Sequence, residues 1–226
     1  MGNNQTTHNT VIVGSVATVN ADSSTAPDDL TRRLVDEAGR LLLEHGIGGL
    51  SLRKLATAVG TSTMSVYTRF GGKQQLLAAM YRQGFDRLGA TLIDAARTSG
   101  DPLHVLAEIG HAYRRAALAS PTLYGLMFGP PIPGFEPSSE NAAAARATYR
   151  PLVDAVRRCV DAQVLTGEPE QVALHLWAVV HGMVSLELAG QLPLDPSTSQ
   201  QAYDRALALA AGPFLTTPSP SNGSSL

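Results

Sequence analysis

The chain has 226 residues, of which 44% are apolar and 16% are charged, and its formal net charge at pH 7 is −2. That length and apolar content are enough for one or two domains with a packed core, and they exclude a disordered or fibrous protein. Taken alone, the near-neutral charge argues against a nucleic-acid partner, because the neutralisation of phosphates usually requires a surplus of basic residues.

The N-terminal residues 1–27 are rich in Asn, Thr, Ser and small side chains and show no helical spacing of apolar residues. We expect a flexible extension there and a second flexible segment at 216–226, where the sequence is TTPSPSNGSSL. The apolar stretch 10–19 is preceded by no Lys or Arg, since the first basic residue is Arg32, which disfavours a secretory signal peptide.

The single cysteine, Cys159, can form no internal disulfide and cannot build a thiolate zinc site by itself. No run of the sequence approaches the roughly 18 apolar residues of a membrane span. These observations predict an intracellular, cytoplasmic protein without a membrane partner.

From residue 28 to residue 215, apolar residues recur at helical spacing almost throughout, and no alternating β-branched run marks a strand. The expected fold class is all-α. The first helix begins near Asp28 and Asp29, whose carboxylates suit a helix N-terminus, and the glycines at 46, 48 and 49 end it.

Two short helices are expected next, LRKLATAV at 52–59 and TMSVYTRF at 63–70. Ser51 and Ser62 stand at their N-cap positions, and glycines follow both helices. Such a pair describes a helix-turn-helix at about 51–70, in which the second helix enters the major groove of double-stranded DNA. An ordinary helical hairpin has the same outline.

The distribution of charge favours the DNA-binding interpretation. Between Gly46 and Phe85 the sequence has no Asp or Glu. The basic residues in the same window are Arg53, Lys54, Arg69, Lys73 and Arg82. The net charge of −2 therefore averages a basic window with a more acidic remainder.

A longer helix is expected from about 73 to 98, and the SGDP break at 99–102 follows it. Further helices are predicted at 103–119, 138–165, 169–189 and 197–211, with an additional helical turn at 121–128. The prolines and glycines between 129 and 137 predict a loop.

The segment GIGGLSLRKLATAVGTSTMSVYTRFGGKQQLLAAM resembles the DNA-binding signature of the TetR (tetracycline-repressor-type) family of transcriptional regulators. The matching positions are Ser51, Leu55, Ala56, Gly60, Tyr67, Phe70 and Lys73. The resemblance covers 28–88 and implies a helix-turn-helix DNA-binding domain there. It also implies that 89–215 form a C-terminal domain that binds an effector and dimerises.

The candidate DNA contacts follow partly from helix position and partly from the resemblance. The early residues of the second short helix are best placed to reach base edges in the major groove. There, Ser and Thr hydroxyls can hydrogen-bond any base, Met64 can lie on a thymine methyl, and Arg69 can bind guanine. The resemblance adds Arg53 as a base or phosphate contact and other residues as contacts to the DNA backbone. The full set is Ser51, Arg53, Ser62, Thr63, Met64, Ser65, Tyr67, Thr68, Arg69 and Lys73. Both cap serines and Tyr67 would also suit a protein that never meets DNA.

The segment HLWAVVHGMVSLELAG at 175–190 resembles the Trp-His-Gly type of TetR C-terminal domain, with Trp177, His181 and Gly182 at the named positions. The first two are four residues apart and share a helix face, and Gly182 would let another helix approach. We expect a cavity for an apolar or aromatic small-molecule effector. Its candidate lining is Tyr113, Tyr124, Met127, Phe128, Tyr149, Trp177 and His181, although for any single one of them core packing is the favoured explanation.

The last two long helices, about 169–190 and 197–211, are apolar enough to pair with their symmetry mates. A C2 homodimer on a palindromic operator follows. The predicted function is a sequence-specific transcriptional regulator, a repressor released by its effector. One alternative is a dimeric DNA-binding regulator without a small-molecule effector.

The other alternative is an all-α enzyme. Cys159, Asp161 and the histidines at 175 and 181 could supply a nucleophile set, but no local motif accompanies them. The string Gly71-Gly72-Lys73 lacks the Ser or Thr and the upstream Gly of a phosphate-binding loop. No catalysis, cofactor or metal is therefore expected.

Overall fold

The computed structural model describes residues 1, 29–192, 195 and 198–216. Within these residues the regular elements are helices, and one isolated antiparallel bridge joins Leu165 to Leu215. The predicted all-α fold class is confirmed. Apart from Met1 and Thr216, the two segments expected to be flexible lie outside the described residues.

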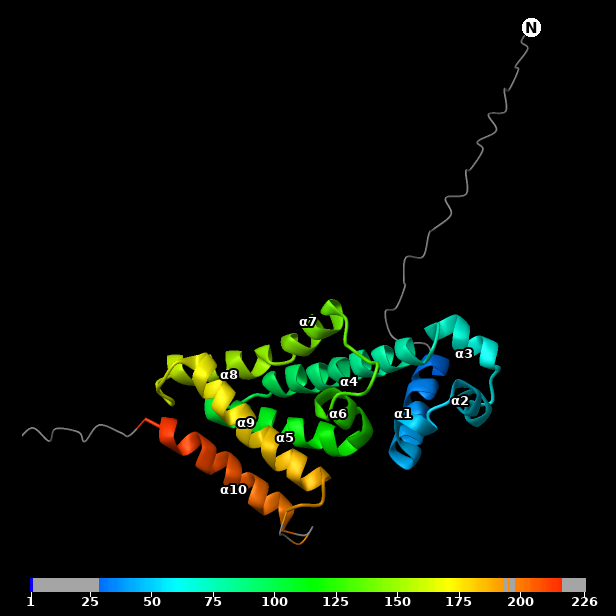
Figure 1. Ribbon diagram of the computed structural model, residues 1–226. Coiled ribbons are helices and arrows are strands. Elements are labelled where there is room, and N and C mark those ends of the chain that lie inside the picture. The colour runs from blue at the N-terminus through cyan, green and yellow to red at the C-terminus, as the bar shows by residue number, and fades with distance from the viewer. Residues whose placement is uncertain (2–28, 193–194, 196–197, 217–226) are drawn as a thin grey trace, which may run out of the picture.

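Most helices follow one another with short connections, and longer segments separate α6 from α7 and α9 from α10 (Figure 1). Their bounds are α1 Asp29–Gly49, α2 Leu52–Val59, α3 Thr63–Phe70, α4 Lys73–Ala96, α5 Pro102–Ala119, α6 Pro121–Phe128, α7 Ser139–Ala147, α8 Arg150–Asp161, α9 Pro169–Leu188 and α10 Ser199–Ala211, followed by a short 3-10 turn at Gly212–Phe214.

The expectation of one helix over 138–165 is wrong. The chain ends α7 at Ala147 and begins α8 at Arg150. Pro151 lies in the first turn of α8, where its missing N–H costs nothing, but inside a continuous helix its ring would clash with the carbonyl of Ala147. Beyond α8, Gln163 adopts a left-handed φ of 57°, so the helical region also stops short of 165.

Local sequence explains the compact arrangement of α1 to α3. Gly46, within the span of α1, has a φ of 63°, which turns the chain before α2. Gly60 ends α2 with a φ of 73°, a left-handed conformation that costs glycine little. Ser62 then caps α3 by accepting a hydrogen bond of 3.0 Å from the backbone N–H of Ser65.

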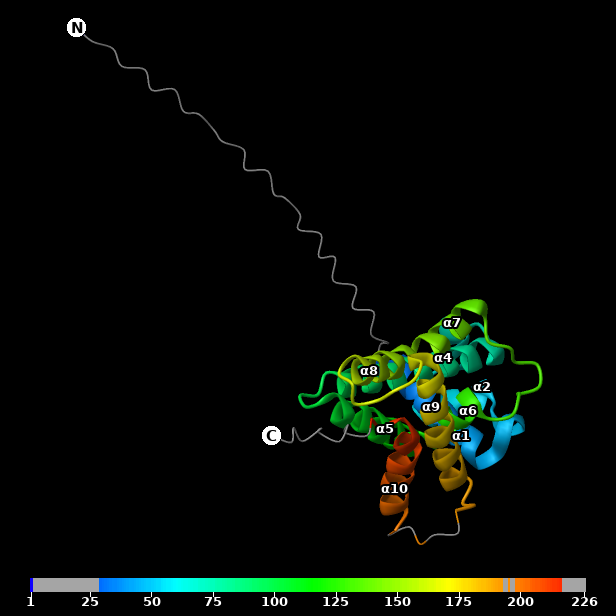
Figure 2. The same ribbon diagram turned by 90° about the vertical axis from the view of Figure 1, so that its left-hand side faces the viewer.

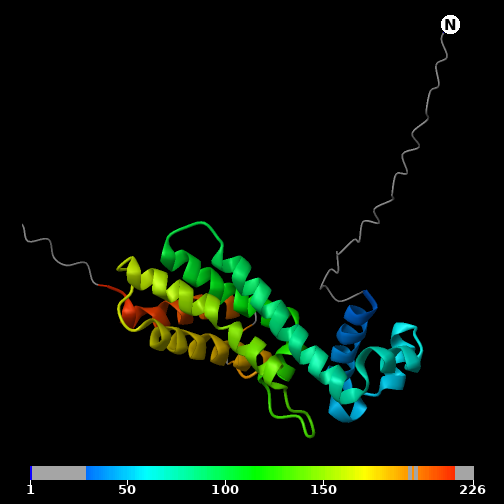
Figure 3. The ribbon, with the colours of Figure 1, turned by 90° about the horizontal axis from the view of Figure 1, so that it is seen from above.

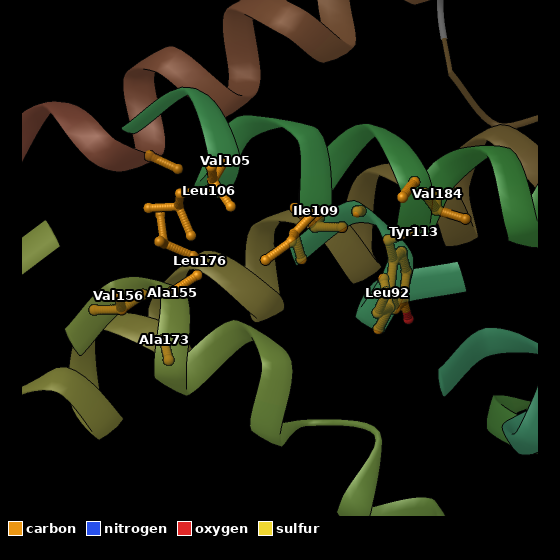
Figure 4. Close-up of a cluster of buried hydrophobic side chains, with 14 of the residues drawn as sticks. Leu92, Val105, Leu106, Ile109, Tyr113, Ala155, Val156, Ala173, Leu176 and Val184 are labelled. Carbon is orange, nitrogen blue, oxygen red and sulfur yellow. The ribbon is translucent and has the colours of Figure 1, made fainter. Parts of the chain in front are cut away.

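Two hydrophobic cores share the helix α4. One core joins α1, α2 and α3 to the first half of α4 and includes Leu34, Leu55 and Val66, all fully buried. The other joins the second half of α4 to α5, α8, α9 and α10, and Figure 4 shows part of it, with Ile109, Tyr113 and Leu176. Seen from above, α4 runs from the small end formed by α1 to α3 into the larger bundle (Figure 3).

The short helix α6 also has residues in both cores. Leu123 is buried in the core around α1 to α3, and the neighbouring Tyr124 is buried in the larger core. On the α1 side, a Cβ added to Gly39 would meet Thr122 at 3.8 Å, an ordinary packing distance. The two ends of the molecule are thus in contact through α6 as well as through α4.

Candidate DNA interface and effector cavity

The helix α3 has a buried face and an exposed face. Val66 and Phe70 pack into the core, whereas Met64 is 72% exposed and Tyr67 is 51% exposed. Thr68 and Arg69 are exposed as well, and Thr63 and Ser65 are half-buried. Met64 and Tyr67 are three residues apart on one helix face, so this face offers a thioether and a phenol for contact with a partner.

The two cap serines differ in their local roles. Ser62 caps α3, and its hydroxyl also lies 2.9 Å from the hydroxyl of Ser65. Ser51 precedes α2 without a capping hydrogen bond from its side chain. The Ser62 hydroxyl is therefore engaged locally, which leaves Thr63, Met64 and Thr68 as the simpler candidates for base contacts.

Lys73 begins α4 and binds back to the turn after α1. Its Nζ donates a hydrogen bond of 2.6 Å to the carbonyl oxygen of Ile47. Because an ammonium group has three hydrogens, this bond does not prevent a further bond to a phosphate. Arg53 and Lys54 are exposed on the neighbouring helix α2.

Arg82 does not belong to this basic surface, although it lies in the acid-free window. Its guanidinium binds the carboxylate of Asp86 at 2.9 Å and that of Glu140 at 3.1 Å. Both acids lie outside the window in sequence. The structure thereby confines the basic character to the end formed by α2, α3 and the start of α4.

A cavity of about 700 Å³ lies in the larger bundle between α4, α5, α8, α9 and α10. Its walls are mainly Leu, Ile, Ala and aromatic side chains, such as Phe85, Leu92 and Ile109. This volume lies within the range of about 300–1,000 Å³ that is typical of small-molecule sites.

The seven candidate cavity residues do not all line this cavity. Those that do are Tyr113, Phe128, Tyr149 and Trp177. Tyr124 and Met127 line a smaller pocket of about 190 Å³ between α4, α5 and α6, and His181 lines neither of the two.

His181 is instead the centre of a hydrogen-bonded cluster with two phenols. Its Nδ1 lies 2.7 Å from the hydroxyl of Tyr124 and 3.1 Å from that of Tyr113, and the two hydroxyls are 3.2 Å apart. On the other side of the ring, Nε2 lies 3.4 Å from the hydroxyl of Ser185. Burial lowers the pKa of His181 and raises the pKa values of both tyrosines, so all three groups are neutral at pH 7.

Two features of this region were absent from the sequence predictions. Leu207 and Ala211 of α10 line the cavity, so α10 is a cavity wall as well as a candidate dimer helix. The charged pair of Arg114 and Glu187 is largely buried between α5 and α9. The residues of α10 lie far in the sequence from the other cavity walls, as Arg114 does from Glu187, so no local sequence pattern predicts either contact.

Among the described residues, no group of three or more His, Cys, Asp or Glu side chains could hold a metal ion. In the same part of the chain, α9 is long and apolar enough to cross a membrane by length and composition alone. The expectation that no run approaches that length therefore does not hold for α9, which packs against α5, α8 and α10.

A basic helix-turn-helix attached to a helical bundle with an internal cavity defines a DNA-binding regulator. Residues 34–80 match the family model of bacterial regulatory proteins of the tetR family, and 106–210 match the tetracyclin repressor-like C-terminal domain. The chain belongs to the TetR family of helix-turn-helix transcriptional regulators. It is a regulator and not an enzyme, and members of its family bind DNA and usually act as dimers.

Individual relatives agree with this assignment. The chain is 30% identical over 190 residues to the uncharacterized HTH-type transcriptional regulator Rv0681 of Mycobacterium tuberculosis, covering 82% of this chain and 83% of that protein. It is 28% identical over 204 residues to the HTH-type transcriptional regulator Rv1816 of the same species, covering 76% and 86%. A solved structure from Rhodococcus sp. RHA1, of a protein with unknown function, is similar with a TM-score of 0.70 and 29% identity, covering 87% of this chain and all of that one.

Proposed function

We propose that the protein is a repressor that a small apolar molecule releases from a palindromic operator. The observation that carries this proposal is the position of α6. Its last residue, Phe128, lines the cavity, and Leu123 on the same helix is buried in the core around α1 to α3. A molecule that displaces Phe128 and shifts α6 would therefore also disturb the packing of this helix against the DNA-binding end.

The proposed domains are a DNA-binding domain at 28–88 and a C-terminal effector-binding and dimerisation domain at 89–215. The two cores support this division. The boundary lies inside α4, whose Leu76 and Met80 pack with α1 to α3 and whose Leu92 packs with the larger bundle. The domains would therefore be connected by a continuous helix and not by a flexible linker.

The proposed DNA interface is the exposed face of α2, α3 and the start of α4. Arg53 and Lys73 would contact phosphates, Tyr67 would hold the register through its hydroxyl, and the exposed side chains at the start of α3 would read bases. The proposed contacts are Ser51, Arg53, Ser62, Thr63, Met64, Ser65, Tyr67, Thr68, Arg69 and Lys73.

Met64 offers a direct test of base reading. If its thioether lies on a thymine methyl, replacing that thymine with uracil should weaken binding of the natural protein by about 0.8 kcal/mol, or roughly four-fold, for one buried methyl. Met64→Ala should bind both duplexes equally, whereas Met64→Leu should keep the preference. Fluorescence anisotropy with each thymine replaced in turn measures this. Equal effects of every replacement in the natural protein and in Met64→Ala would contradict the contact.

The proposed homodimer uses the outer face of α9 together with α10, which lie side by side (Figure 2). Leu174 and Ala178 are exposed, and so is Leu186, which continues the same four-residue spacing through Gly182. Apart from its chain neighbours and the backbone of its own helix, no atom of the described residues lies within 4 Å of a Cβ added at Gly182. An exposed apolar stripe with a small residue at its centre is suited to close packing against the same stripe of a second copy.

A charge on this stripe is expected to prevent dimerisation. Leu174 is 56% exposed, so Leu174→Glu should leave the protomer folded while placing two carboxylates at a twofold interface. Leu43→Glu is the matched control, because Leu43 is 68% exposed on α1, away from α9. Sedimentation velocity at micromolar concentration should show a monomer for Leu174→Glu and a dimer for Leu43→Glu. A dimer in both variants would place the interface elsewhere.

The repressor proposal is tested with DNA duplexes selected from a random pool by the purified protein. The selected duplexes should be palindromic, as expected for a C2 dimer. Neutral apolar molecules that bind the folded protein raise its melting temperature, and a true effector among them should also weaken duplex binding, while the duplex weakens the binding of that effector by the same factor. Molecules that raise the melting temperature but leave duplex affinity unchanged would favour a dimeric regulator without a small-molecule effector. Because its partner is double-stranded DNA, we propose that the protein acts in the cytoplasm.

A further inference from the structure

One tyrosine of the cavity wall, Tyr113, carries a hydroxyl group among apolar and aromatic side chains. Tyr113 lines the cavity beside Phe128, and the indole N–H of Trp177, which lines it too, lies within hydrogen-bonding reach of the Tyr113 hydroxyl. Its hydroxyl is the part of the His181 cluster that belongs to a cavity-lining residue, since neither Tyr124 nor His181 lines this cavity.

The hydroxyl hydrogens of Tyr113 and Tyr124 differ in the strength of the hydrogen bonds that they make within the cluster. A neutral imidazole nitrogen that accepts has one lone pair, so Nδ1 of His181 can accept from only one of the two phenols. The hydroxyl of Tyr124 is the closer, at 2.7 Å, against 3.1 Å for Tyr113. The Tyr113 hydrogen is then left with the oxygen of Tyr124 at 3.2 Å, which is long for an O–H···O bond.

The charges of the cavity lie at its edge. Arg146 and Asp204 are both exposed, and His111 stands 3.6 Å from Asp204. The polar groups beside Phe128 and Trp177 are instead neutral phenols and a neutral imidazole. A charged group in that position would lose its hydration without gaining a counter-charge, which is costly.

We propose that the cavity selects an uncharged, largely apolar molecule with one hydrogen-bond acceptor, such as a ketone or ester carbonyl, and that the Tyr113 hydroxyl donates to that acceptor. This inference rests on the proposed effector role of the cavity and adds the chemical class of the ligand and the residue that recognises it. Tyr124 keeps the His181 nitrogen satisfied while the Tyr113 hydrogen turns to the ligand. When the Tyr113 hydroxyl changes its acceptor from Tyr124 to the ligand, each side chain of the cluster keeps a hydrogen-bond partner.

The test uses three molecules with the same diphenyl framework: benzophenone, diphenylmethane and diphenylacetate. Each displaces the neutral fluorophore N-phenyl-1-naphthylamine from the full-length protein, which gives three dissociation constants. The decisive quantity is the dissociation constant of diphenylmethane divided by that of benzophenone. In Tyr113→Phe this ratio should fall by about five-fold, the usual effect of one hydrogen bond to a neutral group.

Tyr149→Phe is the matched control for that ratio. Tyr149 is a second tyrosine of the cavity wall, but its hydroxyl donates to the carbonyl of Glu170 at 3.2 Å. The ratio should therefore equal that of the natural protein. Diphenylacetate should bind more weakly than benzophenone to the natural protein and to both variants.

An unchanged ratio in Tyr113→Phe, or tighter binding of diphenylacetate than of benzophenone, overturns the inference. If Tyr113→Phe does not fold, an infrared measurement on the natural protein tests the inference instead. The infrared carbonyl stretch of bound ¹³C-labelled benzophenone should shift to lower frequency than in hexane, and an unshifted band overturns the inference. Selective duplex binding measured on the same samples tests the DNA-binding role separately, so failure of the ligand class and failure of the proposed function are distinguishable.

Discussion

Arg53→Glu is expected to weaken binding to the selected duplex by roughly 100-fold, because it replaces a phosphate-facing cation with an anion on the proposed interface. Arg53 is exposed on α2 and has no role in either core. The melting temperature should therefore stay within about a degree of that of the natural protein, since exposed substitutions rarely change stability. Anisotropy titrations at several salt concentrations measure both the loss of affinity and a salt slope smaller by about one.

Arg97→Glu is the matched control for this charge reversal. Arg97 immediately follows α4 at the end away from α3, and its side chain is 75% exposed. It changes the net charge of the protein by the same amount, so it separates the local field from the overall charge. Equal losses of affinity in the two variants would contradict the proposed interface.

Arg114→Met is expected to lower the free energy of unfolding by about 3 kcal/mol, because it leaves a largely buried carboxylate without its partner. The Arg114 guanidinium binds both carboxylate oxygens of Glu187, at 2.6 and 2.8 Å, and also contacts Ser199 and Gln200. It lies over the ring of Tyr203 as well. This single side chain therefore joins α5, α9 and the start of α10.

The double variant Arg114→Met with Glu187→Leu should recover most of the lost stability, since an apolar pair of similar size carries no unpaired charge. Urea denaturation measures all three proteins. A double variant no more stable than Arg114→Met would show that the loss came from packing and not from the unpaired carboxylate.

The same pair gives the stability a predictable pH dependence. Arg114 holds the pKa of Glu187 below its ordinary value of 4.5. The unfolded carboxylate therefore binds a proton at a higher pH than the folded one, and the stabilisation, fully present above about pH 5, is lost as the pH falls through the lowered pKa. In the double variant this part of the acid dependence should disappear.

The DNA-binding end was predictable because its signals are local. Gly60, Gly71 and the cap Ser62 mark the ends of α2 and α3 within a few residues, and Val66 with Phe70 shows the buried face of α3 by spacing alone. The break between α7 and α8 also had a local signal, Pro151, but Ala-rich and Arg-rich residues on both sides obscured it.

The cavity was predictable only in part, because its walls come from distant segments. Trp177 and His181 share a face of α9, yet only Trp177 reaches the cavity, since Tyr113 and Tyr124 of α5 and α6 lie against His181. Likewise, Arg82 binds the carboxylate of Glu140, which is 58 residues away in the sequence. Spacing within one helix cannot specify which other helix covers it.

The uninterrupted course of α4 has a mechanical consequence. A helix of 24 residues is about 36 Å long at 1.5 Å per residue, and here it has the DNA-reading end at one extreme and the cavity wall at the other. A tilt of about 5° at the cavity end would displace the far end by roughly 3 Å, close to the 3.4 Å step between successive base pairs. In the proposed dimer, two such helices would act on one operator, so a tilt of this size around a ligand would put both copies of α3 out of register with their half-sites.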